Sequence, residues 1–186
     1  VIVSDLGVMS VVQEHSSIPV HLSTQASCLN TNSAKAWKEL GAKRIILGRE
    51  VSIEDATRIR QNVGLEVEMF IHGAMCMAYS GNCTISNYAA GRDSNRGGCV
   101  QSCRFSYRVE AGGDAGSEAR LVSFMSSKDL RGLRLLPRFV EAGISSIKIE
   151  GRMKSCLYVA TCVQAYSRGL QMLRDLPGER WPKALE

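Results

Sequence analysis

The sequence predicts an α/β fold in which parallel strands alternate with helices. Short β-branched or apolar runs recur at intervals of about 20–30 residues with helical patterns between them, which is typical of parallel strands joined by crossover helices. A chain of 186 residues with 45% hydrophobic residues can bury a substantial core. No apolar run approaches the ~18 residues of a membrane span, so we expect a soluble, cytoplasmic protein without membrane contact.

Four strands are expected in the first part of the chain, each as an apolar run. They cover residues 1–4, 20–23, 44–47 and 67–71. The first intervening helix centres on residues 9–14. The next is predicted to begin at Asn32 or Ser33, because these side chains suit the N-cap position. Ser52 and Asp55 form a capping-box-like start for the third helix.

The second part of the chain is expected to contain two helices and a fifth strand. Residues 127–142 are predicted to be helical, with a bend or break at Pro137. Residues 146–149 form the strand, and the last helix follows it. A glycine-rich exposed turn is expected before them. Its glycines are Gly112, Gly113 and Gly116.

Five such strands fit either an open sheet or five-eighths of a (β/α)8 barrel. Two observations favour the barrel: the chain opens directly in a strand, and no glycine-rich dinucleotide fingerprint follows any strand. We expect a fragment consisting of the C-terminal five strands of a TIM-like barrel. Its three parts are a partial barrel over 1–75, a cysteine-rich insertion over 76–126, and a final helix–strand–helix with a tail over 127–186. Unpaired sheet edges predict marginal stability or oligomer formation.

Four of the seven cysteines lie in one polar, glycine-rich segment, Cys76-x6-Cys83-x15-Cys99-x3-Cys103. Thiolates this close in sequence can converge on one metal or iron–sulfur centre at small cost in chain entropy. Zinc stays open, although the C-x2-C pairs usual at structural zinc sites are absent. Disulfides suit secreted proteins, yet no signal peptide is visible, and simple packing is the other alternative. The remaining three are expected to pack as small apolar side chains: Cys28, Cys156 and Cys162.

Polar residues follow all five predicted strands, at the ends where parallel α/β folds place their sites. They are Ser4–Asp5, Ser23–Thr24–Gln25, Arg49–Glu50, His72–Gly73 and Glu150–Gly151–Arg152. We expect these ends to converge on one mouth, with the cysteine segment above it.

Candidate roles follow from the chemistry of these side chains. The candidates for substrate binding are Gln25, Arg49, Lys148 and Arg152, and those for catalysis are Glu50, His72 and Glu150. With a period of two, Lys148, Glu150 and Arg152 share one face of the last strand, and Ile147 and Ile149 take the other. A structural set of ion pairs is the alternative explanation for these three charges.

Arginines gather in and beside the cysteine segment, although the net charge of +5 is mild. They are Arg92, Arg96, Arg104 and Arg108. Such clustering suits a polyanionic or carboxylate-bearing partner, with Arg92 and Arg96 as binding candidates, whereas a solvated surface is the alternative.

Several blocks of the sequence together resemble the collagenase-like peptidase family U32. These are residues 68–86 (EMFIHGAMCMAYSGNCTIS), 91–99 (GRDSNRGGC), 127–130 (SKDL) and 148–155 (KIEGRMKS), with 23–25 (STQ). The resemblance implies a TIM-like barrel whose first three strands are absent here, and oxygen-independent RNA hydroxylation. The implied reaction is formation of 5-hydroxyuridine at the tRNA wobble position, with prephenate as the oxygen source and a [4Fe–4S] cluster.

One departure from the family pattern concerns the cluster ligands. The implied ligands match Cys76, Cys83 and Cys99, but the fourth position, after SKDL, holds Arg131. A guanidinium stays protonated and cannot ligate iron. Cys103 replaces the fourth ligand, or one iron is open, or the chain is an inactive copy.

Two other functions stay in view beside RNA hydroxylation. A collagenase-like protease is one, with a cysteine nucleophile and His72 as its base, although no G-x-S-x-G or H-E-x-x-H motif appears. A non-catalytic remnant or scaffold is the other, supported by Arg131 and by the missing barrel strands.

Overall fold

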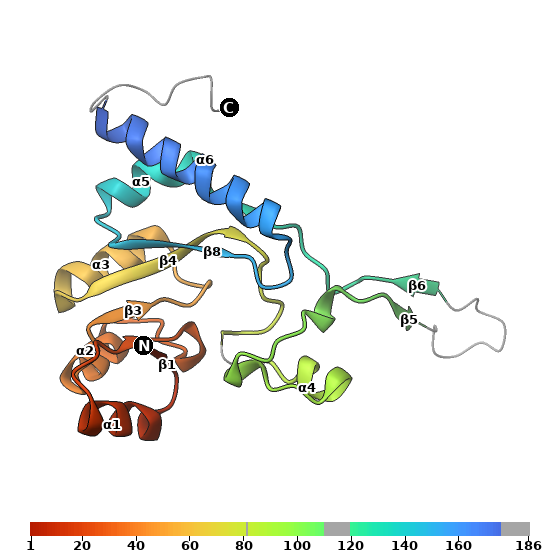
Figure 1. The fold of residues 1–186 in the computed structure, drawn as a ribbon, viewed down its shortest axis with the longest axis horizontal. Coiled ribbons are helices and arrows are strands. Elements are labelled where there is room, and N and C mark those ends of the chain that lie inside the picture. Colours follow the sequence, from red (N-terminus) through yellow and green to blue (C-terminus); the bar gives the residue numbers. More distant parts are fainter. Residues whose placement is uncertain (81, 110–119, 176–186) are drawn as a thin grey trace.

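The computed structural model describes residues 1–80, 82–109 and 120–175 (Figure 1). The turn expected around Gly112, Gly113 and Gly116 and the tail after residue 175 lie outside the described residues.

All five expected strands are present and form one parallel sheet. They are β1 (Ile2–Val3), β2 (His21–Leu22), β3 (Arg44–Ile46), β4 (Glu66–Gly73) and β8 (Ser146–Glu150), paired in that order. A short strand, β7 (Leu130–Arg131), pairs antiparallel with the end of β4. Neighbours in the parallel sheet thus follow chain order, and their C-terminal ends meet at one edge.

Most of the described α-helices pack beside this sheet (Figure 1). They are α1 (Leu6–His15), α2 (Thr31–Glu39), α3 (Ile53–Val63), α5 (Leu136–Glu141) and α6 (Cys156–Asp175). The main core joins strand residues such as Ile45 and Ile71 to Ile59 of α3, Leu136 of α5 and Tyr166 of α6. The parallel sheet with crossover helices is therefore confirmed, and closure into a barrel stays a prediction. None of the described helices combines the length and apolarity needed to cross a membrane.

Local side-chain hydrogen bonds fix where two helices begin. Ser52 caps α3 as expected, because its Oγ accepts the Asp55 amide at 3.0 Å. The cap expected for α2 at Asn32 or Ser33 is wrong. Asn30 holds that position, and its Oδ1 accepts the Ser33 amide at 2.9 Å. A short Asn side chain reaches an amide three residues ahead, so the helix starts earlier than the apolar pattern indicated.

The helix expected over 127–142 is mostly wrong. β7 occupies Leu130–Arg131, a 3-10 turn follows at Leu133–Leu135, and α5 begins only at Leu136. Pro137 therefore lies in the first turn of α5, where a missing amide costs nothing, rather than bending a longer helix. The amide of Gly132 bonds the Ile71 carbonyl at 2.9 Å, and this sheet contact overrides the helical pattern.

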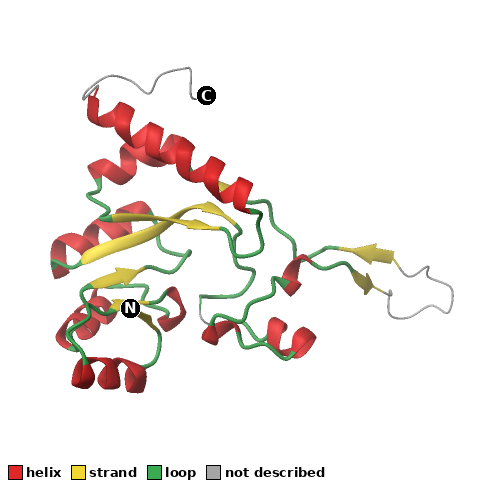
Figure 2. Cartoon of the chain, in the orientation of Figure 1, coloured by secondary structure: helices red, strands yellow, loops and turns green. Residues whose placement is uncertain are grey.

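The cysteine-rich segment runs between β4 and β7 and is mostly irregular (Figure 2). It contains α4 (Ile85–Ala90), short 3-10 turns at Ser94–Arg96 and Ser102–Arg104, and a ribbon of β5 (Tyr107–Val109) and β6 (Arg120–Val122). It leaves the sheet at Gly73, whose φ of +100° suits glycine, and where a Cβ would lie 2.1 Å from the Glu150 carbonyl oxygen. The segment thus starts beside the C-terminal end of β8.

Candidate functional site

A cavity of about 1100 Å³ lies between the strand ends and the cysteine-rich segment. All four clustered cysteines line it: Cys76, Cys83, Cys99 and Cys103. Four of the five predicted strand ends line it too, through Asp5, Gln25, Arg49 and the run 150–152. Lys148, Arg96 and Arg104 line it as well. The expected convergence of strand ends beneath the cysteine segment is what the structure shows.

The four cysteines line one cavity, but their side chains are not arranged as a metal-binding set in the described structure. Among the described residues, no three His, Cys, Asp or Glu side chains are arranged to hold a metal ion. Cys103 is buried, and its Sγ accepts a hydrogen bond from Arg104 Nη1 at 3.0 Å. Cys99 Sγ accepts the Gln101 amide at 3.4 Å. Although Cys76 is exposed as a residue, partial burial of its thiol raises its pKa, as do the neighbouring Cys83 and Cys103.

Arg49 places a positive charge among these thiols. Its guanidinium carbon lies 3.8 Å from the centre of the Phe70 ring. Burial lowers the Arg49 pKa, while Cys76, Glu150, Glu50 and Cys99 act in the opposite direction. The Arg49 guanidinium can therefore pair with thiolates, a sulfide or a carboxylate in the cavity.

Three buried polar atoms in the cavity wall have no hydrogen-bond partner in the described structure. They are Thr24 Oγ1, Arg49 Nε and Ser94 Oγ, and all three residues line the cavity. A buried polar group without a partner costs about 1–3 kcal/mol. Their presence in the lining of one cavity fits a polar or anionic group held inside it.

Several predicted site residues hold the cysteine-rich segment in place. Glu50 accepts both the amide and the hydroxyl of Ser80. Gln25 donates to the carbonyl of Ser94. Glu150 accepts from the side chain of Gln101 at 3.2 Å. Each of these hydrogen bonds joins a strand end to the cysteine-rich segment, so Glu50, Gln25 and Glu150 act as positioning residues. Glu50 itself does not line the cavity.

His72 lies on the other face of the sheet from the cavity. The β4–β8 register shifts between Phe70, which pairs with Lys148, and His72, which pairs with Ile149. One extra residue turns the following side chain to the opposite face. The ring consequently packs against α6, and the expected position of His72 in the mouth is wrong.

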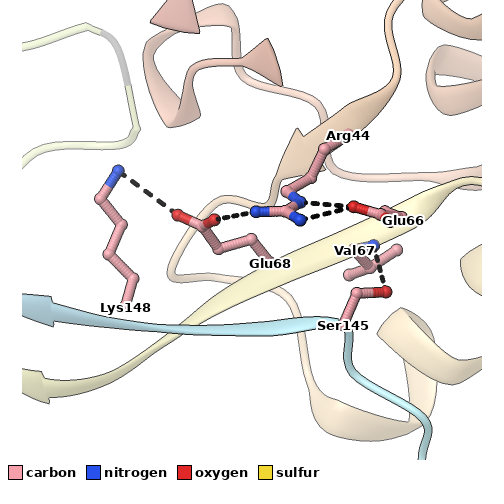
Figure 3. A network of polar contacts seen from close by, with 6 residues as sticks. All are labelled: Arg44, Glu66, Val67, Glu68, Ser145 and Lys148. Carbon is pink, nitrogen blue, oxygen red and sulfur yellow. Dashed lines mark hydrogen bonds and ion pairs between the residues drawn. The ribbon is translucent and has the colours of Figure 1, made fainter. Parts of the chain in front are cut away.

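Lys148 belongs to a row of charges across the sheet (Figure 3). Its Nζ lies 3.6 Å from Glu68, whose other oxygen lies 3.5 Å from Arg44, which in turn pairs with Glu66 at 2.6 Å. Burial lowers the pKa of Lys148, and the Glu68 charge opposes that shift. The structural ion-pair explanation thus holds for Lys148, which also lines the cavity.

The remaining predicted residues separate into two groups. Arg152 and Arg96 line the cavity and are exposed. Arg92 and Arg131 are also exposed, but neither lines the cavity. Arg131 pairs with His72 in the β4–β7 ladder. The position expected for a fourth cluster ligand therefore does not face the cavity.

Sequence reasoning missed several polar residues of the cavity. Ser80, Ser86 and Ser102 are buried within its wall, where Ser86 Oγ lies 3.8 Å from Cys99 Sγ. Gln101 was also missed, and its positive φ of 57° turns the chain between Cys99 and Cys103. Serine is common in every loop, so no spacing signal in the sequence marks these positions.

Comparison with known proteins decides the family. The profile of Peptidase family U32 matches residues 1–183. The chain belongs to this family. Among U32 relatives, tRNA hydroxylation protein P1 of Bacillus subtilis is 46% identical over 157 residues, which cover 82% of this chain and 37% of that protein.

Other U32 relatives carry different names. A 23S rRNA 5-hydroxycytidine synthase of Escherichia coli is 35% identical over 182 residues, which cover 96% of this chain and 27% of that protein. A collagenase of Porphyromonas gingivalis is 33% identical over 184 residues, which cover 92% of this chain and 44% of that protein. The chain thus spans less than half the length of each of these U32 relatives.

Proposed function

We propose that this chain is the part of an RNA hydroxylase that holds an iron–sulfur cluster. One observation supports this most: four cysteines and three buried polar atoms without partners line the same cavity. The names of the RNA-hydroxylating relatives supply the reaction class. Hydroxylation of a tRNA wobble uridine, within a TIM-like barrel, is the specific form that we propose.

The cysteines offer a suitable donor set for a [4Fe–4S] cluster. Cys76, Cys83, Cys99 and Cys103 would hold it, because four thiolates are its usual ligands. Cys103 lines the cavity whereas Arg131 does not, and this favours Cys103 as the fourth ligand over an open iron. When bound, the cluster would supply a redox-active or Lewis-acidic centre. Arg49 would offset the negative charge of its thiolates.

We propose that a carboxylate-bearing co-substrate such as prephenate binds in the same cavity through its basic side chains. Arg152 is exposed there and presents a planar fork suited to a carboxylate. Arg49 Nε lacks a partner and faces the same space. Lys148 adds positive charge beside Glu68. We assign carboxylate binding to Arg152 first, because it is exposed and carries no ion pair in the described structure.

The cysteine-rich segment is the surface that we assign to RNA. Its exposed arginines suit phosphate groups, and Tyr88 on α4 is 95% exposed. Exposed aromatic rings beside basic side chains are typical of surfaces that stack unpaired bases. The segment borders the cavity through Arg96 and Arg104, so a bound RNA loop would lie next to the cluster.

The test begins with anaerobic reconstitution of the chain, followed by iron and sulfide analysis and visible absorbance. We expect about four irons per chain, as in a [4Fe–4S] cluster, and charge-transfer absorbance. A full-length U32 relative that carries this chain in place of its matching part, prepared in the same way, should hydroxylate RNA when prephenate is supplied. Wild-type protein without iron above background would refute the cluster, and zinc in its place would identify a structural metal site.

A protease is less well supported by the same cavity. None of the described residues that line it is a histidine, so a cysteine there has no imidazole base. Peptide hydrolysis by the chain that persists after all four cavity cysteines are replaced would contradict our preference for hydroxylation over proteolysis.

A further inference from the structure

A second group of reactive side chains lies against α6, away from the cavity. His72 Nε2 is 3.3 Å from Cys162 Sγ, and His72 Nδ1 is 3.1 Å from the Tyr166 hydroxyl. The His72 ring contacts Tyr158 and Tyr166, with centroids 5.7 and 5.5 Å apart. None of these four residues lines the cavity, so the proposed hydroxylation does not use them.

The hydrogen bonds around Tyr166 determine which nitrogen of His72 carries the proton. The Tyr166 hydroxyl is buried and donates its single proton to the Ile71 carbonyl at 3.2 Å. It can therefore only accept from His72, which places the imidazole proton on Nδ1. The Nε2 lone pair then faces the Cys162 thiol, in the arrangement by which a histidine base deprotonates a nucleophile.

The surroundings favour the neutral form of this imidazole. Burial lowers the pKa of His72; among the nearby charges, Asp129 opposes the shift and Lys154 adds to it. Asp129 and Lys154 pair with each other at 2.7 Å, and Asp129 also accepts the Tyr158 hydroxyl at 2.9 Å. Burial raises the pKa of Tyr166 to about 12, so its hydroxyl stays protonated, and Arg131 is the remaining charge near that ring.

We infer that Cys162 is a nucleophilic thiol that His72 activates for exchange with small disulfides. In the step, Nε2 takes the thiol proton and the Cys162 sulfur attacks one sulfur of a disulfide. The disulfide S–S bond breaks as the new one forms, and the leaving thiolate takes the proton from the imidazolium. Cys162 becomes half of a mixed disulfide, with no other oxidant consumed. Cys162 is partly exposed, and the proposal requires a small disulfide to reach its sulfur.

Cys156 provides an internal comparison on the same helix. Cys156 is exposed, whereas Cys162 is only partly exposed. If accessibility alone decided the rate, Cys156 would react faster with a small disulfide. Activation by His72 predicts the reverse order near neutral pH, because an unassisted thiol has a pKa of about 8.5 and is mostly protonated there.

The experiment measures modification of each cysteine by dithiodipyridine, a small neutral disulfide, in the intact chain. Mass spectrometry of the peptide that contains both thiols separates Cys162 from Cys156. We expect Cys162 to react at least about tenfold faster than Cys156 at pH 7, because general-base catalysis contributes roughly 10²–10⁴-fold and the lower exposure of Cys162 offsets part of that gain. In His72→Gln this advantage should disappear, and the Cys162 rate should rise with pH as for a simple thiol.

Tyr166→Phe is the second variant, because it keeps the ring but removes the acceptor for Nδ1–H. It should lower the Cys162 rate less than His72→Gln does, while circular dichroism verifies that both variants fold. A Cys162 rate equal to or below that of Cys156 in the wild type would overturn the inference. So would an unchanged Cys162 rate in folded His72→Gln. Because these readouts require neither iron nor RNA, they are independent of the proposed hydroxylase function.

Discussion

Glu50 and Ser80 form a two-point hydrogen-bonded clamp between the sheet and the cysteine-rich segment. Glu50 Oε1 accepts the Ser80 amide at 2.8 Å, and Oε2 accepts the Ser80 hydroxyl at 2.9 Å. Ser80 lies between Cys76 and Cys83 and is 2% exposed, whereas Glu50 follows β3. A residue expected to act in catalysis thus determines where two of the proposed ligands lie.

Removing this clamp should loosen the cluster site more than the fold. In Glu50→Ala we expect the free energy of unfolding to fall by about 1 kcal/mol, because the bonds are charge-assisted but the carboxylate is accessible to water. Iron retained after gel filtration should fall clearly below that of wild type. Glu54→Ala is the matched control, since it breaks only the exposed pair with Arg138 and should change neither quantity. Equal iron retention in the two variants would argue against a positioning role for Glu50.

The identity of the fourth cluster ligand can be tested with two substitutions. Cys103 is buried in the cavity wall, and Arg131 is exposed on β7. We expect Cys103→Ser to reduce iron and sulfide per chain after reconstitution, and Arg131→Cys to leave them unchanged. If Arg131→Cys instead raises cluster occupancy, the ligand was lost at position 131 and the loop must move to bring that residue inward.

Lys148 and Arg152 should differ in what they contribute. Lys148→Met leaves Glu68, which is 8% exposed, with Arg44 alone, and we expect a loss of about 1–3 kcal/mol in stability. Arg152→Lys should leave the melting temperature nearly unchanged. In a full-length U32 relative that carries this chain in place of its matching part, it should reduce RNA hydroxylation about tenfold, or about 1.4 kcal/mol, through loss of a charge-assisted contact. A large drop in melting temperature for Arg152→Lys with normal activity would make Arg152 structural.

The pH dependence of stability should show the contribution of Asp129. Hydrogen bonds from Lys154 and Tyr158 hold the pKa of this carboxyl below its ordinary value, although burial opposes them. The stabilisation is therefore complete above the unfolded pKa of about 3.9 and is lost as the pH falls through the folded pKa. Asp129→Asn should unfold at lower urea concentration than wild type at pH 7, and the difference should shrink toward pH 2. A difference independent of pH would assign the effect to packing.

Strand positions and the convergence of strand ends could be predicted because both depend on local patterns. An apolar run followed by polar residues marks β3 and Arg49 without any knowledge of the tertiary structure. The cysteine spacing likewise predicted which thiols share a cavity. Parallel strands bring their C-terminal ends together whatever the detailed side-chain packing.

Features that depend on register or on distant partners could not be predicted. The bulge after Phe70 reverses the face of His72, and only the pairing with β8 reveals it. β7 forms because the end of β4 offers hydrogen-bonding groups, although residues 127–142 carry a helical pattern. Cys162 was expected to be a packing residue, yet the same bulge places His72 against it. A shift of one residue in register therefore moved a candidate base from one site to another.

Tyr88 should contribute to RNA binding without contributing to the fold. It is 95% exposed on α4, and the helix ends at Gly91, after which the exposed Arg92 follows. A ring that contacts so little protein adds almost nothing to stability, whereas stacking on an unpaired base contributes about 1–3 kcal/mol. We expect Tyr88→Ala to weaken binding of a single-stranded oligonucleotide by at least about fivefold in fluorescence anisotropy, with an unchanged melting temperature.

Tyr88→Phe keeps the stacking face and should bind nearly as wild type. The salt dependence of binding should be similar in all three proteins, because the phosphate contacts are retained. If Tyr88→Ala binds as tightly as Tyr88→Phe, the cysteine-rich segment holds RNA through its charges alone.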